Sequence, residues 1–293
     1  MIELEPPVYR PPSEARSLIL QATIGCSHNQ CAFCVAYQEK RFRARPLKDI
    51  LREIDWAGEH LPDTRRVFLA DGDAFVLSPD RLVPVLERLR RRLPRLERIS
   101  AYASPQNIGK KKDDELRRIR RAGLELLYYG LESGDDEVLR RIRKGATSKQ
   151  MVEAARRAQE AGFDLSVTVI LGLAGPQGSR RHAEATARAL DAISPRWAAA
   201  LTLMLAPRRP SYPEVYGDPD WRELDTREAL GECRTLLANM HADGITFRSN
   251  HASNYLALKG ELQRDRQALL DLIDRVLDDP DSPYLRPDYL RAL

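Results

Sequence analysis

Short apolar, strand-like runs alternate with amphipathic helices along residues 17–205 of the 293-residue chain, and this alternation limits the fold more than any other feature. Six strands are expected, at residues 17–24, 66–70, 98–103, 124–129, 165–171 and 197–205. The intervening helices are expected to begin at Pro46, Pro79, Asp135, Ser148 and Ser179, among others. Repeated strand–helix units of this length imply a parallel sheet with right-handed crossovers. The sequence therefore predicts an α/β fold with fewer units than the eight-fold barrel.

Three of the four cysteines lie directly after the first of these strands. Cys26, Cys31 and Cys34 leave four residues in the first gap and two in the second, and Gly25 lets the backbone turn just before the first thiol. Three thiolates on one short loop can each bind one iron of a cubic 4Fe–4S cluster and leave the fourth iron without a protein ligand. Phe33 is expected beside whatever occupies that iron.

This loop resembles the cluster loop of the radical S-adenosylmethionine (radical SAM) superfamily, within a group of uncharacterised iron–sulfur oxidoreductases. That family usually has three residues in the first gap, so this chain carries one extra, and an aromatic residue precedes the last cysteine in both. The resemblance implies a partial (βα)6 TIM-like barrel with a C-terminal, mostly helical extension. It also implies a 4Fe–4S cluster, S-adenosyl-L-methionine (SAM) and hydrogen abstraction by a 5′-deoxyadenosyl radical. The expected divisions are an N-terminal extension (1–16), the barrel (17–207) and an extension (208–293) with helices at 226–240 and 261–277.

Three other interpretations of the cysteines remain open. Plant-type ferredoxins use the same spacing with a fourth cysteine further along, which here would be Cys233. A structural zinc site would need a fourth ligand such as His28 or His251. The thiols could also be unrelated buried cysteines. The alternative function is therefore a non-enzymatic iron–sulfur or zinc protein.

Barrel enzymes place their chemistry in loops at the carboxyl ends of the strands, so the SAM ligands are sought there. Asp71, Gly72 and Asp73 follow the second strand, where the radical SAM family often has Gly-Gly-Glu against the amino group of SAM. A carboxylate suits an ammonium group, and glycine permits close approach. The alternative is an acidic turn, since Asp and Gly are common turn residues.

The other strand ends carry further candidates. Residues 130–145, GLESGDDEVLRRIRKG, resemble a segment of methylthiotransferase-like and cobalamin-associated radical SAM enzymes, which implies that Glu132 and Ser133 contact SAM. Residues 171–176 resemble the strand that contacts adenine, although Gly and Pro also mark ordinary turns. The expected cofactor-binding residues are Phe33, Asp71, Gly72, Asp73, Ser104, Glu132, Ser133 and Gly172.

A dense polar run within residues 244–260 resembles the tail of a radical SAM group labelled coproporphyrinogen oxidase-like. The expected substrate contacts there are Arg248, Asn250, His251 and Asn254. The alternative is a loop held by side-chain-to-backbone hydrogen bonds. Cys233 and Tyr255 are candidate hydrogen-atom donors to the substrate radical, against the alternative that Cys233 packs inside a helix.

The composition of the chain limits which classes of partner are expected. The chain is 43% hydrophobic and 31% charged with a formal net charge of +4, and no apolar run reaches the roughly 18 residues of a membrane span. The basic runs are interleaved with leucine, isoleucine or acids, as on solvated helix faces, so neither a membrane nor a nucleic acid is expected as a partner. Clustered cysteines in a chain of this length indicate the reducing cytoplasm. The expected partners are a small-molecule or macromolecular substrate and an electron donor such as flavodoxin or ferredoxin, with the enzyme acting as a monomer.

Overall fold

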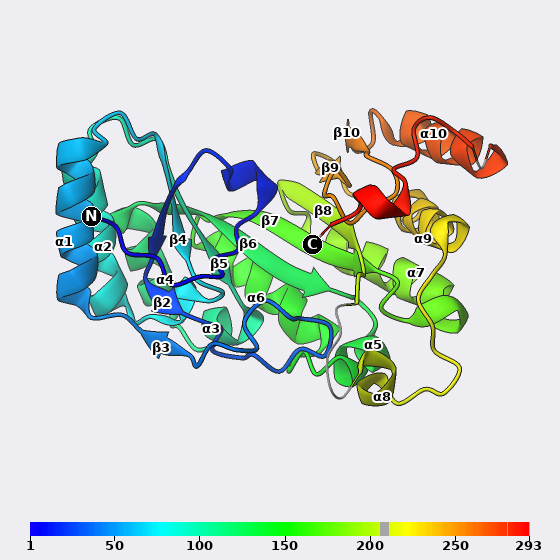
Figure 1. Cartoon of the computed structure of the whole chain (residues 1–293), viewed down its shortest axis with the longest axis horizontal. Helices are drawn as coiled ribbons and strands as arrows, with labels where there is room; N and C mark the ends of the chain where they lie inside the picture. The colour runs from blue at the N-terminus through cyan, green and yellow to red at the C-terminus, as the bar shows by residue number, and fades with distance from the viewer. Residues whose placement is uncertain (206–210, 280, 293) are drawn as a thin grey trace. The chain divides into compact units, whose positions relative to one another are not determined.

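The structure is a computed structural model, and it describes residues 1–205, 211–279 and 281–292. The contacts between residues divide the chain into two compact units. The first comprises Met1–Asn29, Cys34–Tyr129 and Glu153–Leu165. The second comprises Gln30–Phe33, Gly130–Val152 and Ser166–Leu293. The elements of both are labelled in Figure 1.

Ten strands and ten α-helices are found in the described residues. The strands are β1 (Leu18–Gln21), β2 (Thr23–Ile24), β3 (Arg43–Ala44), β4 (Arg66–Ala70), β5 (Arg98–Ala103), β6 (Leu124–Glu132), β7 (Asp164–Leu171), β8 (Trp197–Thr202), β9 (Thr246–Arg248) and β10 (Lys259–Glu261). The helices are α1 (Leu47–His60), α2 (Pro79–Arg92), α3 (Pro105–Gly109), α4 (Asp113–Ala122), α5 (Asp136–Arg141), α6 (Ser148–Glu160), α7 (Gly175–Ile193), α8 (Tyr212–Tyr216), α9 (Thr226–Ala238) and α10 (Arg266–Asp278).

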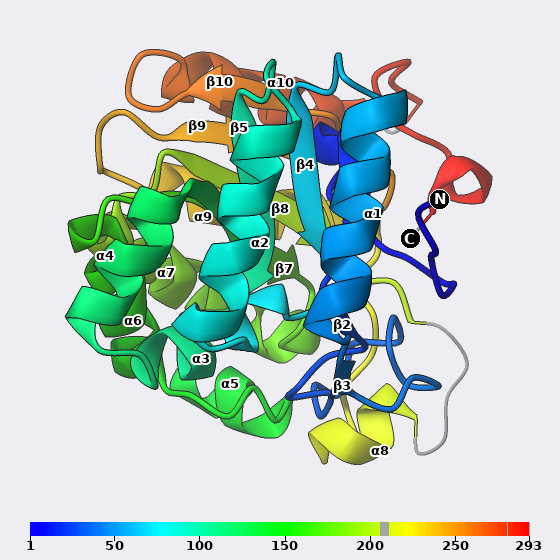
Figure 2. The ribbon, with the colours of Figure 1, turned by 90° about the vertical axis from the view of Figure 1, so that its left-hand side faces the viewer.

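The first unit contains the parallel neighbours β1, β4 and β5, followed by β6 as far as Tyr129. Helix α1 packs against α2, and α2 packs against α4. Figure 2 shows α1 and α2 lying over β4 and β5. Strand β4 is apolar along its whole buried length, with Val67, Phe68 and Leu69 all fully buried, as expected for a strand covered on both faces.

The segment predicted as one strand at residues 17–24 forms two strands. Strand β1 pairs with β4, whereas β2 pairs antiparallel with β3. The break falls at Ala22, whose N–H donates to the Ala70 carbonyl (2.6 Å), and the Asp71 N–H donates to Thr23 (3.1 Å). Strands β2 and β3 thereby bracket the cysteine loop, residues 25–42, beside the carboxyl end of β4.

The second unit contains the parallel strands β7, β8 and β9, and β10 lies antiparallel to β9. Helix α9 packs against both α7 and α10 (Figure 1). Strand β10 was not predicted: its first two residues belong to the polar run of residues 244–260, and Glu261 is the expected start of a helix that begins only at Arg266. The structure also begins α7 at Gly175 and continues β6 to Glu132.

The last predicted strand, 197–205, is shorter than expected. Strand β8 ends at Thr202, whose N–H donates to the side chain of Ser253 (3.3 Å) instead of continuing the strand. The prolines at 207 and 210 that were expected to end this strand, and the barrel boundary at 207, lie outside the described residues.

Candidate active site

The three clustered cysteines lie in the loop between β2 and β3. Cys26, Cys31 and Cys34 are each partly exposed, as is Phe33, and Gly25 turns the chain before the first thiol with a positive φ of 74°. As the described residues lie, no three histidine, cysteine or carboxylate side chains are grouped closely enough to hold a metal ion. The three thiols therefore lie on one loop, and each of them is partly accessible to solvent.

A single buried carboxylate holds both ends of this loop. Asp71, immediately after β4, is fully buried, and its Oδ2 accepts hydrogen bonds from the Gly25 N–H (3.0 Å) and from Lys40 Nζ (2.8 Å). Gly25 directly precedes Cys26, and Lys40 lies six residues after Cys34. The loop is thus closed at its base by Asp71, a role that sequence reasoning did not assign to this residue.

Asp73 lies against the start of the same loop. Its Oδ2 accepts short hydrogen bonds from the Ser27 hydroxyl and from Asn107 Nδ2. Burial raises the pKa of Asp73 to about 6, although these two hydrogen bonds oppose the shift. Asn107 is held in turn by Ser104, whose hydroxyl accepts the Asn107 N–H (3.2 Å) as the N-cap of α3. Ser104, predicted to touch SAM, thus caps a helix that supports Asp73.

Gly72 is required by a neighbouring aromatic ring. A Cβ atom at this position would lie 2.4 Å from Cε2 of Tyr37, whose side chain is buried. Burial raises the pKa of Tyr37, and the negative charges of Asp71 and of Cys34 add to the rise. Gly72 thus makes room for Tyr37, a residue that was not among the predicted site residues.

Three buried polar atoms around this loop have no hydrogen-bond partner among the described residues. They are Oδ1 of Asp71, Oδ1 of Asp73 and the hydroxyl of Tyr37. An unsatisfied buried acceptor is costly, so such atoms mark places where a ligand can supply donors. An ammonium group carries three donors and suits the two carboxylate oxygens. The two carboxylate oxygens therefore fit the amino group of SAM, and the three thiols beside them fit a cluster.

The second unit holds the other predicted SAM contacts, beginning with Glu132. This residue has a positive φ of 62°, and its carboxylate pairs with Lys144 Nζ at 2.9 Å. A Cβ on Gly130 would lie 2.1 Å from Oε1 of Glu132, so the glycine leaves room for the carboxylate to fold back. The Gly-Leu-Glu sequence therefore shapes a constrained end of β6.

Ser133 is part of a buried hydrogen-bond network. Its hydroxyl lies 2.8 Å from His182 Nδ1 and accepts the Asp135 N–H at 3.0 Å. His182 Nε2 lies 3.1 Å from the Ile170 carbonyl and donates its hydrogen to that oxygen. Within this unit, Ser133 joins β6 to α7.

Glu232 organises the predicted adenine loop and was missed by sequence reasoning. Its Oε1 accepts the Gly172 N–H (2.7 Å), and its Oε2 accepts a short hydrogen bond from Ser179. Burial raises the pKa of Glu232. Sixty residues separate it from Gly172, so no local pattern could have revealed this contact.

The two candidate hydrogen-atom donors share a very small cavity. Cys233 is 3% exposed, and burial, with the nearby Glu232, raises its pKa to about 12. Tyr255 is also buried, with Arg291 over its ring at 3.9 Å and hydrogen-bonded to its hydroxyl. Their common cavity has about 10 Å³, room for no more than about one water. This geometry favours the packed interpretation of Cys233.

The predicted substrate residues have mixed surroundings. Asn254 is buried and bridges to β8, accepting from the Thr202 hydroxyl (2.9 Å) and donating to the Ala200 carbonyl (2.9 Å). Asn250 is exposed, and Arg248 is half-buried on β9. These contacts favour the anchored-loop interpretation for Asn254 and leave Asn250 accessible.

His251 accepts a hydrogen bond at Nδ1 from the Ser253 N–H (3.1 Å). Burial, together with the charge of Arg286, lowers the pKa of His251. Arg286 donates to the carbonyl of His251 at 3.0 Å and also to that of Asn254. The imidazole is thus a neutral, hydrogen-bonded group near pH 7.

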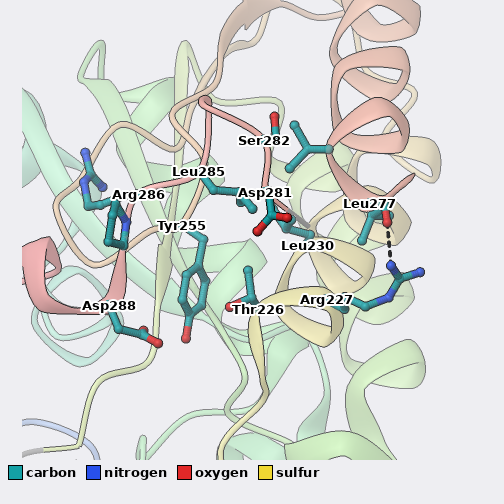
Figure 3. Close-up of a pocket in the computed structure, with 12 residues that line it drawn as sticks. Thr226, Arg227, Leu230, Tyr255, Leu277, Asp281, Ser282, Leu285, Arg286 and Asp288 are labelled. Atoms are coloured by element: carbon teal, nitrogen blue, oxygen red, sulfur yellow. Dashed lines mark hydrogen bonds between the residues drawn. The ribbon is translucent and has the colours of Figure 1, made fainter. Parts of the chain in front are cut away.

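A larger cavity, of about 440 Å³, lies in the second unit between α9, α10 and the residues after α10. Figure 3 shows Tyr255 and Thr226 facing the C-terminal residues Asp281 and Leu285. One wall is fixed by Arg227, which donates to the Leu277 carbonyl. The volume falls in the range of small-molecule sites, but its lining mixes both charge signs and points to no one ligand class.

Comparison with known proteins decides the family. The profile described as "Radical SAM superfamily" matches residues 20–189, more than half of the chain. The chain belongs to the Radical SAM superfamily. The heme chaperone HemW of Bacillus subtilis is 25% identical over 175 residues, which cover 57% of this chain and 46% of HemW. The chain thus spans less than half the length of that relative.

Solved structures of the superfamily share the fold. Coproporphyrinogen III oxidase (HemN) from Escherichia coli, described as a radical SAM enzyme, has a TM-score of 0.55 and 17% identity, covering 76% of this chain and 53% of HemN. The radical SAM methyltransferase TsrM from Kitasatospora setae, solved with cobalamin and a [4Fe-4S] cluster, has a TM-score of 0.53 and 19% identity, covering 65% of this chain and 37% of TsrM. The superfamily membership and the barrel-like α/β fold predicted from the sequence are confirmed. Within the part of the chain that the structure describes, no helix is both long and apolar enough to cross a membrane.

Proposed function

We propose that this chain is a radical SAM enzyme that binds a 4Fe–4S cluster through Cys26, Cys31 and Cys34. The observation that carries the proposal is the loop itself. Three partly exposed thiols lie on a segment closed at its base by Asp71, whose Oδ1, like that of Asp73, has no donor among the residues that the structure describes. When bound, the cluster supplies the electron that cleaves SAM to methionine and a 5′-deoxyadenosyl radical, which takes a hydrogen atom from the substrate.

In this proposal the chain's own residues bind and orient SAM. The unpartnered Oδ1 atoms of Asp71 and Asp73 receive the amino group. The positive ammonium stabilises the ionised form of Asp73, so binding lowers the pKa that burial raises. Glu132 and the backbone at Gly172, which Glu232 holds, are further SAM contacts in this proposal. Phe33 precedes the last ligand, Cys34, in the sequence and would lie beside whatever occupies the open iron.

The substrate is an organic molecule that loses a hydrogen atom, and the reductant is a small electron-transfer protein such as flavodoxin or ferredoxin. Asn250 and Arg248 are the substrate contacts we propose from the polar run, because neither is fully buried. Cys233 is not proposed as a donor to the substrate radical, since it is almost fully buried against a cavity that holds about one water.

The alternative of a ferredoxin-like or zinc protein needs a fourth ligand. Cys233 suits that role poorly, because it is 3% exposed and lies against a cavity with room for no more than about one water. The enzyme is therefore the function that the site supports best.

Anaerobic reconstitution with iron and sulfide tests the proposal. We expect four irons per chain, an absorbance near about 400 nm, and 5′-deoxyadenosine after addition of SAM and dithionite. Alanine at Cys26, Cys31 or Cys34 should each abolish all three signals, and Cys233→Ala should preserve them. Two irons without SAM cleavage, or zinc as the bound metal, would contradict the proposal and support the alternative.

A further inference from the structure

Lys40 is a buried lysine whose three possible donors are all used. Its side chain is 4% exposed, and Nζ lies 2.6 Å from the Glu5 carbonyl, 2.6 Å from the Pro7 carbonyl and 2.8 Å from Asp71 Oδ2. An ammonium group has three N–H donors and no acceptor, so these contacts satisfy it fully. All four residues belong to the first unit. Lys40 thereby joins the N-terminal segment to the base of the cysteine loop.

The N-terminal segment is held in place by further contacts. We call residues 3–9 the strap. The Glu5 N–H donates to Gln21 Oε1 (2.7 Å), and Gln21 Nε2 returns a hydrogen bond to the Glu5 carbonyl (3.1 Å). Tyr9 meets the ring of Tyr37 edge-on, with the ring centroids 5.7 Å apart. The strap is therefore packed along the second half of the cysteine loop, between β1 and Tyr37.

We propose that Lys40 is a positioning residue for the cluster loop, and that the strap acts through it to keep the loop closed. Asp71 Oδ2 accepts hydrogen bonds from both Lys40 and the Gly25 N–H. One oxygen therefore holds the residue before Cys26 and a residue after Cys34. The two strap carbonyls supply two of the three acceptors that hold Lys40 there. This inference rests on the proposed function, because it takes Cys26 and Cys34 as cluster ligands.

The physical reason is the cost of buried charge. An ionised lysine and aspartate are stable inside a protein only when their remaining hydrogen bonds are satisfied. Without the strap, Lys40 would lose two of its three hydrogen-bond acceptors and would turn toward water, drawing the end of the loop with it. The thiols would then spend more time apart, and the cluster would be released faster. The strap thus slows the release of the cluster from the loop.

Two variants test this inference. The first, Lys40→Met with Asp71→Asn, cuts the link to the strap while leaving no unpaired buried charge, and asparagine still offers an oxygen to Gly25. The second removes residues 1–9 and keeps the Lys40–Asp71 pair. Lys48→Met is the matched control, because Lys48 is an exposed lysine on α1 in the same unit.

Each protein is reconstituted without SAM, and the release of iron to a chelator is timed by the loss of absorbance near about 400 nm. We expect both variants to release iron about tenfold faster than wild type, which corresponds to about 1.4 kcal/mol, and the control to match wild type. Thermal unfolding of the cluster-free proteins, followed by circular dichroism, separates this effect from loss of fold. Combining the two variants should add nothing further, because both break the same link between Lys40 and the strap carbonyls.

Wild-type release rates in both variants, or rates that multiply in the combined variant, would overturn the inference and leave the proposed function intact. Failure of the wild-type protein to bind four irons would overturn the proposed function instead. If the double substitution unfolds the chain, the truncation alone decides, since it leaves the buried pair in place.

Discussion

Gly72 offers a direct test of how the loop packs, because the structure gives one steric reason for glycine there. A Cβ at this position would lie 2.4, 2.8 and 2.9 Å from three ring atoms of Tyr37, well inside contact distance. The ring is rigid and buried, so it or the backbone must move. The backbone of Gly72 is not in the left-handed region, so alanine brings no conformational strain of its own. Overpacking of this kind costs about 1–3 kcal/mol, and we expect Gly72→Ala to lower the free energy of unfolding by that amount.

Urea-induced unfolding of the cluster-free protein measures this change. In a Tyr37→Leu background the clash is absent, so the same Gly72→Ala substitution should cost less than about 0.5 kcal/mol, the limit for independent sites. Gly231 supplies a control of opposite sign: it lies inside α9 with open space around its Cβ position, and Gly231→Ala should stabilise by about 0.5–1 kcal/mol. Equal costs for Gly72→Ala in the wild-type and Tyr37→Leu backgrounds would refute the steric explanation.

Three further predictions concern titration, cofactor binding and thiol reactivity. Asp73 has a pKa of about 6 in the folded protein against an ordinary value of 3.8. Its contribution to stability is therefore present at low pH and is lost as the pH rises through 6. Asp73→Asn should raise the free energy of unfolding at pH 8 by up to about 2–3 kcal/mol, and this gain should shrink toward pH 5. A gain independent of pH would contradict this. Glu132→Ala should weaken SAM binding about tenfold by calorimetry while leaving the iron content unchanged, and unchanged affinity would remove Glu132 from the site. In the cluster-free protein, a thiol reagent at pH 8 should modify the three loop cysteines quickly and Cys233 only on unfolding, because that thiol is 3% exposed with a pKa of about 12. Four equally fast thiols would show that α9 opens.

The sequence by itself determined the family and most of the barrel. Continuous apolar runs flanked by turn residues fixed β4 and β5 at their observed bounds, because burial on both faces leaves a local signal that needs no knowledge of neighbours. The spacing of Cys26, Cys31 and Cys34 is likewise local, since a short loop alone limits which metal group three thiols can share. The three residues of β10 escaped prediction because a strand so short is defined by its partner β9 and not by its own pattern.

The tertiary structure alone decided what the polar residues at the strand ends do. Asp71 was expected to meet SAM, and the fold also makes it the brace of Gly25 and Lys40, residues 46 and 31 positions away. Gly72 makes room for Tyr37, and Glu232 reaches Gly172 across sixty residues. Hydrogen bonds and steric contacts act over about 3–4 Å in space whatever the distance along the chain, so residues far apart in sequence meet only once the strands and helices have packed.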